Sequence, residues 1–279
     1  MKKKQLILCM GLSAMSLFTS CNSGERDFGL GQPEGPKEKG TLILNLNAET
    51  SFEQQTRAVN EDAFRNTDNY NVKITDSKGN IKFNDTFATL KTRLPMDFDL
   101  GSYTISASYG KEFAASRDNF LSTGSETFTI GKTPVETTVK CTPTAGKLSV
   151  EFDASMDLYC DTYSVDFTGT SKLGTTAAHW GKGESAPYYL TLNEDEGGET
   201  VNYTIYLTAK ADYAGLNGKE KVTDATATGN FKLERNKWKK LIVKANYTPS
   251  TEGGLKIVIE FDERTNDKPI NIEVPVTWI

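Results

Sequence analysis

Histidine is almost absent from this 279-residue chain, because His179 is its only copy. Any Ser-His-Asp or Cys-His site would have to use this residue, and its neighbours Ala178, Trp180 and Gly181 match no nucleophile elbow. The chain also lacks a C-x-x-C pair and a phosphate-cradling glycine motif. These absences speak against nucleophilic, redox and zinc chemistry, so we expect a protein that is not an enzyme and that binds no cofactor.

Clusters of Lys and Arg interleaved with aromatic residues are missing too, and the formal net charge is -5. We therefore expect no nucleic-acid partner. Asp153, Asp157 and Asp161 fall at four-residue intervals but lack the glycine and final glutamate of an EF-hand loop. They predict solvated side chains, or at most calcium ligands, and no metal site is expected. The acidic segment 193–199 is interpreted as a solvated hairpin tip.

No hydrophobic run is long enough for a transmembrane helix. The apolar run from Leu6 to Phe18 falls short of the roughly 20 residues that a spanning helix needs. It follows three lysines and ends in small residues before Cys21, which is the pattern of a secretory signal with a lipobox. We therefore predict a signal peptide over 1–20, a lipidated Cys21 and an exported protein held to the outer membrane by its lipid.

Residues 21–39 are rich in Gly, Pro and charge, with too little apolar surface to fold. This composition predicts a flexible tether with a root-mean-square reach on the order of 25 Å. Glu25 and Asp27 lie close behind the lipidated cysteine, where surface-exported lipoproteins of the Bacteroidota carry acidic residues. They favour the cell surface over the periplasmic leaflet, and the alternative is an ordinary solvated linker.

Two cysteines remain once the signal peptide and the lipidated residue are set aside. Cys141 and Cys160 could close a disulfide loop, which would stabilise the fold by roughly 3 kcal/mol in the chain-entropy model. The alternative is two separately buried thiols. The spacing alone does not decide between them.

The dominant hydrophobic period along the chain is two, the signature of β-strands. Segment 70–83 predicts a hairpin in which Gly79 takes the positive φ of a type I turn with a bulge. Helix is expected only as a turn or two around 60–66 and 111–117. We predict an all-β chain with two tandem antiparallel β-sandwich domains, Ig-like or transthyretin-like, over 40–143 and 144–279. The second includes a terminal hairpin over 254–279.

Several of these segments resemble a known family. They are Gly40–Leu46, Thr56-Arg57-Ala58, Tyr70–Asp76 and Leu100–Gly110, and they look like an uncharacterised lipoprotein family of gut Bacteroidales that is catalogued only as a domain of unknown function. Asn236-Lys237-Trp238, leading into an alternating strand, is similar to fimbrillins, the subunits and anchors of lipid-delivered fimbriae. The second resemblance implies tandem β-sandwiches, strand-exchange assembly and other fimbrial subunits as partners.

In fimbrillins, cleavage after an arginine releases a first strand and opens a groove for a donor strand from the next subunit. Arg57 follows the hydrophobic strand Leu42–Leu46 in the matching order, so the resemblance implies proteolytic maturation between Arg57 and Ala58. The alternative is that Arg57 lies in an exposed loop and the strand stays in place. The C-terminal hairpin is either a donor element or the completion of its own sheet.

A second functional interpretation depends on aromatic residues. Trp180, Tyr188 and Tyr189 flank a Gly-Lys-Gly-Glu-Ser-Ala-Pro loop, and their rings could stack on sugar faces in a surface glycan-binding lipoprotein with host or glycan ligands. Core packing is the competing explanation for each ring. The first hypothesis is a non-catalytic, fimbria-like or adhesive structural component that works through β-strand addition.

Overall fold

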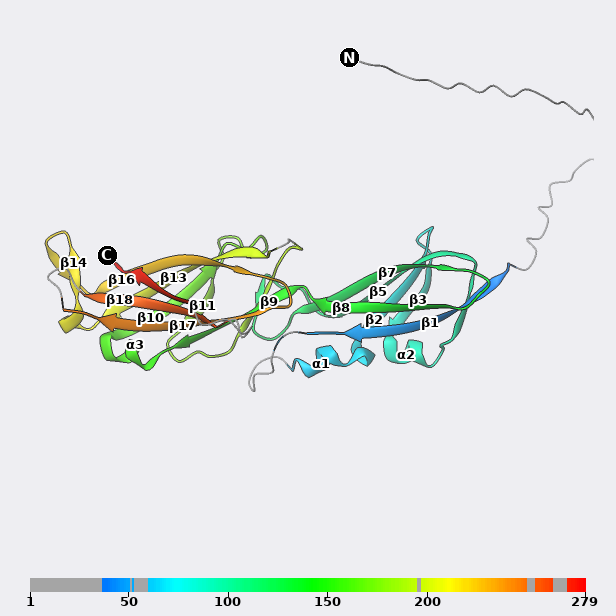
Figure 1. The fold of residues 1–279 in the computed structure, drawn as a ribbon, viewed down its shortest axis with the longest axis horizontal. Coiled ribbons are helices and arrows are strands. Elements are labelled where there is room, and N and C mark those ends of the chain that lie inside the picture. The colour runs from blue at the N-terminus through cyan, green and yellow to red at the C-terminus, as the bar shows by residue number, and fades with distance from the viewer. Residues whose placement is uncertain (1–36, 51, 53–59, 195–196, 250–253, 263–269) are drawn as a thin grey trace, which may run out of the picture. The chain divides into compact units, whose positions relative to one another are not determined.

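The computed structural model describes residues 37–50, 52, 60–194, 197–249, 254–262 and 270–279. Nearly all of their regular structure is β-strand (Figure 1), which confirms the predicted all-β fold class. The signal peptide, Cys21 and the tether up to residue 36 lie outside the described residues, and so do Arg57 and Ala58. What the sequence implies for them stays a prediction.

The first part of the chain forms a seven-stranded sheet in the order β3-β2-β5-β7-β8-β1-β4. Its strands are β1 (Lys39–Ala48), β2 (Asn71–Asp76), β3 (Ile81–Thr86), β4 (Met96–Asp99), β5 (Gly101–Gly110), β7 (Leu121–Ile130) and β8 (Val135–Pro143). Its helices are α1 (Asp62–Arg65), the 3-10 turn η1 (Thr67–Asn69) and α2 (Phe87–Lys91). Side chains from both ends of this strand order share one hydrophobic cluster, among them Leu42, Val72 and Ile105, so the sheet folds over its own core as a sandwich.

The second part forms a five-stranded sheet, β11-β10-β13-β16-β20, and a six-stranded sheet, β19-β18-β17-β9-β12-β6. The strands are β9 (Ala145–Phe152), β10 (Cys160–Thr168), β11 (Ala178–Gly181), β12 (Tyr188–Thr191), β13 (Glu199–Ala209), β16 (Asp224–Leu233), β17 (Trp238–Tyr247), β18 (Leu255–Asp262), β19 (Ile270–Pro275) and β20 (Thr277–Trp278), with a small hairpin of β14 (Gly215–Asn217) and β15 (Glu220–Val222). Helix α3 (Ala154–Tyr159) and the 3-10 turn η2 (Ala211–Tyr213) complete it. Phe167 and Ile205 of one sheet pack in the same cluster as Val243 and Ile259 of the other, which makes a second sandwich.

Contacts between the two parts are extensive enough that residues Glu38–Ile279 form one compact unit. Strand β6 (Ala115–Ser116) comes from the first part but pairs with β12 of the second. A third hydrophobic cluster also takes residues from both, among them Phe64 and Tyr189. The predicted division into domains 40–143 and 144–279 therefore stays a prediction, although β8 does end at Pro143 and β9 begins at Ala145.

The first strand of each part is paired in the same unusual way. β1 runs parallel to β8 and is antiparallel to the short β4 over Lys39–Leu42 alone. Similarly, β9 runs parallel to β17 and is antiparallel to the short β12 over Ala145–Leu148. The prediction of purely antiparallel sandwiches is therefore wrong, because each contains one parallel strand pair. The two parts also share a structural repeat that is not visible as a sequence repeat.

Local predictions have mixed outcomes. The hairpin over 70–83 is confirmed by β2 and β3, with Gly79 at a φ of 81° and a register shift between Ile74 and Thr75. Helix α1 confirms the expectation for 60–66, but the helix expected over 111–117 is wrong, since that segment contains β6. The C-terminal strands complete their own sheets, because β19 pairs with β18 and β20 pairs with β16.

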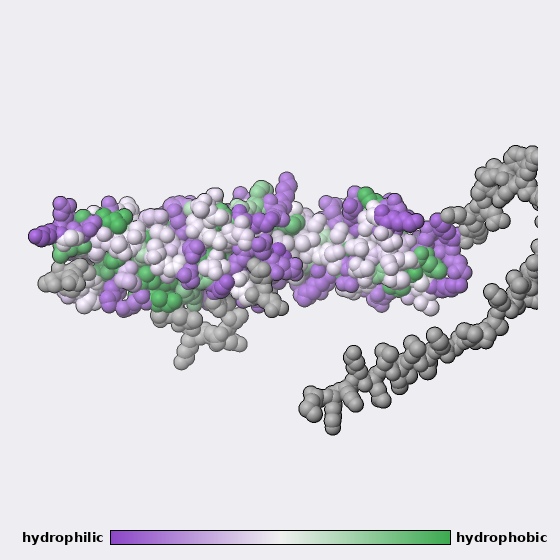
Figure 2. Space-filling view, turned by 90° about the horizontal axis from the view of Figure 1, so that it is seen from above, coloured by the Kyte–Doolittle hydropathy of each residue, from purple (hydrophilic) through white to green (hydrophobic). Residues whose placement is uncertain are grey.

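The surface is mixed in character. Figure 2 shows hydrophobic residues in small separate patches among polar ones on the face in view. Within the described residues, no helix is long and apolar enough to cross a membrane.

Candidate functional site

Strand β1 is the element that best fits a site of strand exchange. Its alternating sequence places Leu42 and Leu44 in the core, where they are 0% and 3% exposed, and Leu46 is half-buried on the same face. Ile43 points outward and is 43% exposed. The period-two pattern therefore predicts correctly which face of the first strand is buried.

The two sides of β1 are covered unequally. Seven residue pairs, Leu42 with Val135 through Ala48 with Cys141, join it to β8. On the other side β4 covers only Lys39 to Leu42, and no described strand pairs with the rest of that edge. We call the space that β1 occupies between β8 and β4 the β1 slot. Removal of β1 would expose a long strand edge and the core side chains beneath it.

Chain packing is tight where β1 begins. A Cβ atom on Gly40 would lie 1.8 Å from the carbonyl oxygen of Gly131, so only glycine fits at this position. Any strand that replaced β1 in the same register would need glycine here too.

After β1 the chain crosses to the third hydrophobic cluster. Phe52 is 1% exposed, and its ring packs edge-on against Phe120 at a centroid distance of 5.4 Å. Its carbonyl oxygen accepts a hydrogen bond of 2.8 Å from Nη2 of Arg65. Phe52 is thus a second buried anchor for the segment that includes β1, and it precedes Arg57 in the chain.

A buried ion pair lies beside Phe52. Nζ of Lys147 is 2.8 Å from Oε1 of Glu61, and the two side chains are 0% and 2% exposed. The hydroxyl of Tyr189 donates a 2.5 Å hydrogen bond to the same carboxylate oxygen. The Lys147 ammonium also faces the ring of Trp238 at 4.9 Å. Burial, as the largest cause, and the hydrogen bond to Glu61 both raise the pKa of Tyr189. The hydroxyl therefore stays protonated and acts as a donor.

This ion pair connects the two parts of the chain. Glu61 comes just before α1, whereas Lys147 belongs to β9 and Tyr189 to β12. The local sequence pattern does not identify this pair, because Lys147 alternates with Ser149 and Glu151 as a solvated strand face would. The only available signal was the position of a lysine at the start of a hydrophobic strand, and that does not identify a buried pair.

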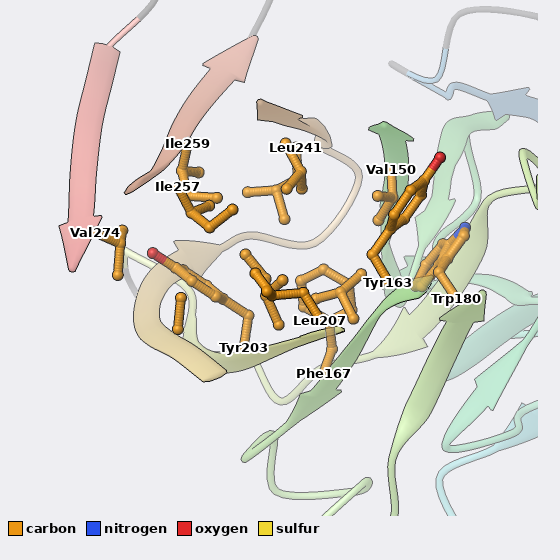
Figure 3. Close-up of a cluster of buried hydrophobic side chains, with 14 of the residues drawn as sticks. Val150, Tyr163, Phe167, Trp180, Tyr203, Leu207, Leu241, Ile257, Ile259 and Val274 are labelled. Atoms are coloured by element: carbon orange, nitrogen blue, oxygen red, sulfur yellow. The ribbon is translucent and has the colours of Figure 1, made fainter. Parts of the chain in front are cut away.

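The aromatic residues suggested for glycan binding do not form an exposed platform. Trp180 is 0% and Tyr189 is 1% exposed, and Figure 3 shows Trp180 in the same buried cluster as Tyr163 and Val150. Tyr188 is half-buried, with its ring 4.6 Å from that of Trp180. The hypothesis of sugar stacking on these rings is therefore wrong, and core packing is the correct explanation.

Arg117 accounts for the conformation of the loop between these aromatic residues. Its guanidinium lies 4.3 Å from the centre of the Tyr188 ring and 5.1 Å from that of Trp180. It also donates to the carbonyl oxygens of Ala186 and His179, at 3.2 and 2.8 Å. The loop is thus held by one arginine from the first part of the chain, and its rings are not free for a ligand.

Both cysteines are free thiols, so the suggested disulfide is wrong. Cys141 belongs to the cluster under the seven-stranded sheet and Cys160 to the cluster of the second sandwich. Burial raises the pKa of the Cys141 thiol to about 12 and, as the largest cause, that of Cys160 to about 11. They are the two separately buried thiols of the alternative interpretation.

The acidic residues serve local structure. Asp153 caps α3 by accepting a 2.8 Å hydrogen bond from the backbone N–H of Ser155. Asp157 pairs with Lys182 at 2.6 Å and accepts from the Tyr163 hydroxyl at 2.8 Å. Among the residues that the structure describes, no group of three His, Cys, Asp or Glu side chains could hold a metal ion.

Glu199 departs from the expected solvated hairpin tip. It is 7% exposed, and its carboxylate accepts hydrogen bonds from the backbone N–H groups of Ser171 and Asn193. Burial acts to raise the pKa of Glu199, but these hydrogen bonds outweigh burial and lower it. This end of the acidic segment therefore closes a turn instead of extending into solvent.

Taken together, the fold and the β1 slot define an all-β protein whose first strand is a core element attached to a predicted lipid tether. The chain belongs to the family described as Domain of unknown function (DUF4493), whose profile matches residues 38–276. This confirms the resemblance to a family known only as a domain of unknown function. No curated protein matches the chain.

Two solved structures illustrate its structural similarity. A fimbrial assembly protein from Parabacteroides distasonis has a TM-score of 0.41 and 11% identity, covering 85% of this chain and 99% of the other. The fimbrial anchor protein Mfa2 from Porphyromonas gingivalis has a TM-score of 0.36 and 10% identity, covering 80% and 97%. Similarity at this level carries no argument about function.

Proposed function

We propose that this protein is a non-catalytic, lipid-anchored component of the cell envelope that assembles or adheres through β-strand addition at the β1 slot. The observation that carries the proposal is that one strand, β1, is both a core element and the first strand after the predicted tether. Lipidation at Cys21 would hold the protein to the outer membrane until β1 is exchanged, with the cell surface favoured over the periplasmic face. Its partners would be other subunits with a strand to donate.

The proposal includes cleavage between Arg57 and Ala58. A cut there would separate β1 and Phe52 from Glu61 and everything that follows. The lipid, the tether and β1 would then form one piece, and the rest of the chain would hold that piece by non-covalent contacts alone. Cleavage thus turns β1 from a covalent part of the fold into an exchangeable one.

Packing indicates that β1 would not leave by itself after the cut. Burial of Leu42 and Leu44 is worth roughly 1.5–3 kcal/mol for each side chain. Seven residue pairs with β8 add backbone hydrogen bonds, and Phe52 adds a further buried ring. Exchange therefore requires an incoming strand that restores the same contacts, which is the energetic condition for ordered assembly by donated strands.

An engineered chain tests the proposal directly. A site for a specific protease replaces residues 54–57, the purified chain is cut, and a labelled peptide with the sequence of residues 39–48 is added in excess. Native mass spectrometry should show the labelled peptide replacing the original fragment at one copy for each chain. A matched peptide with Leu42→Asp and Leu44→Asp should fail to exchange. Equal uptake of both peptides, or none of the native one, would contradict the proposal.

A further inference from the structure

A hollow in the first part of the chain has the chemistry of a small-molecule site. It has a volume of about 500 Å³, within the range of roughly 300–1,000 Å³ that is usual for small-ligand sites. Four asparagines line it: Asn60, Asn69, Asn71 and Asn119. We call it the asparagine pocket.

The amide groups of the pocket are largely unoccupied by the protein. Within the described residues, no side-chain hydrogen bond involves Asn60 or Asn71, which are exposed at its rim. Asn69 uses only its amide nitrogen, toward the carbonyl oxygen of Ala63 at 2.8 Å. Asn119 uses only its oxygen, which accepts from the backbone N–H of Lys111 at 3.0 Å. Donors and acceptors both remain available, and a hydroxyl group needs both.

In two other hollows of the described structure, the charged side chains are already engaged by neighbouring residues. In the hollow beside Phe152, Glu151 pairs with Lys240 and Asp157 with Lys182. The remaining charged residue of its lining, Glu184, pairs with Arg117. In the hollow beside Tyr206, the imidazole of His179 is already 2.6 Å from Asp166. The asparagine pocket is the only one of these three that is lined by asparagine side chains, whose amides offer both donors and acceptors.

Contacts within the protein position part of the wall of the asparagine pocket. A Cβ on Gly110 would lie 1.9 Å from the carbonyl oxygen of Phe120, so the backbone there can approach only as glycine. The buried Tyr70 hydroxyl donates to the Phe64 carbonyl oxygen at 2.7 Å and lies 2.9 Å from Oγ of Ser122. These contacts position Phe64, which is part of the pocket lining together with Tyr109. Preorganised walls lower the cost of ordering a bound ligand.

The charges of the pocket indicate the ligand class. Lys111 and Asp118 supply one charge of each sign, so the lining favours neither an anion nor a cation. The amide groups and the Ser108 hydroxyl suit the hydroxyl groups of a neutral sugar, and Phe64 and Tyr109 add apolar surface to the lining. Asp118 is the only carboxylate in the lining, whereas glycoside hydrolysis uses two, so a bound sugar would not be cleaved.

We infer that the asparagine pocket binds a neutral saccharide. This site is distinct from the β1 slot and from the loop 181–187 that follows Trp180. The test uses the full mature chain and a panel of neutral manno-, xylo- and malto-oligosaccharides and neutral mucin-type glycans, with sialylated and sulfated glycans for comparison. Binding is measured by array and then by titration calorimetry with the best neutral glycan. The double variant Asn60→Ala/Asn71→Ala should weaken the Kd at least tenfold.

The matched control is Asn84→Ala, because Asn84 is an exposed strand asparagine that lies outside the pocket lining. It should change the Kd less than twofold, and thermal melts should show that all variants are folded. The inference is overturned if the wild-type chain binds no neutral glycan of the panel. It is also overturned if acidic glycans are preferred, or if the control loses as much affinity as the double variant.

Discussion

The buried ion pair between Lys147 and Glu61 makes a sharp prediction about stability. The substitution Glu61→Leu removes the carboxylate and leaves the Lys147 ammonium buried without its 2.8 Å partner. Loss of one member of a buried pair typically costs about 3–5 kcal/mol, because the remaining charge is uncompensated. We expect a loss of that size in the free energy of unfolding.

The double variant Glu61→Leu/Lys147→Met should recover most of this loss. It replaces both charges with apolar side chains of similar volume, and such replacements of buried pairs are often neutral or stabilising by about 1–4 kcal/mol. The exposed pair of Lys132 and Glu38 provides the control, since its side chains are 72% and 62% exposed. Lys132→Met should therefore cost no more than about 1 kcal/mol.

Equilibrium urea unfolding followed by tryptophan fluorescence measures these differences, since the Trp238 ring lies 4.9 Å from the Lys147 ammonium. The reasoning is refuted if Glu61→Leu costs no more than the exposed control. It is also refuted if the double variant is less stable than Glu61→Leu alone, because the cost would then not arise from the loss of the carboxylate beside Lys147.

Three further predictions follow from single residues. Asp153→Ala should lower stability at pH 7 by about 1 kcal/mol, because it removes the cap of α3. The hydrogen bonds from Ser155 lower the pKa of Asp153, so its contribution should be present at neutral pH and be lost as the pH falls through the folded-state pKa. Melts of wild type and variant should therefore converge as the pH falls below the usual pKa range of aspartate. Cys141 and Cys160 should resist alkylation by iodoacetamide at pH 8 in the native protein and react once the protein is unfolded. Peptide mass spectrometry measures the labelling, and rapid labelling of the native protein would contradict their burial. Trp180→Ala should destabilise the fold by about 3–5 kcal/mol in denaturant titrations, and an unchanged midpoint would mean that the ring is not part of the core.

Strand periodicity made much of the fold predictable. The hairpin of β2 and β3 and the buried face of β1 follow from local alternation and from Gly79, which are properties of the residues themselves. The parallel pairing of β1 with β8 could not be predicted in this way, because it joins segments about ninety residues apart. Segment 111–117 was wrongly expected to be helical because its pairing with β12 is also long-range.

The candidate sites were less predictable than the fold. Leu42 and Leu44 mark the β1 slot by their spacing, but Glu61 and Lys147 are polar residues that only tertiary contacts bury. Trp180 was misread for the opposite reason, since an aromatic ring beside a glycine-rich loop looks the same in sequence whether it is exposed or in the core. The residues that line the asparagine pocket come from four separate stretches of chain, so no local sequence pattern predicts the pocket.

The most direct test of the proposed function is to identify the N-terminal residue of the protein on intact cells. Intact cells are treated with a protease, and mass spectrometry then identifies the N-termini of the surface-released and membrane-held forms. The proposal predicts a surface population that begins at Ala58, with residues 39–48 as the exchanged strand. A single population that begins at lipidated Cys21 would contradict maturation by strand exchange and leave a permanently anchored protein.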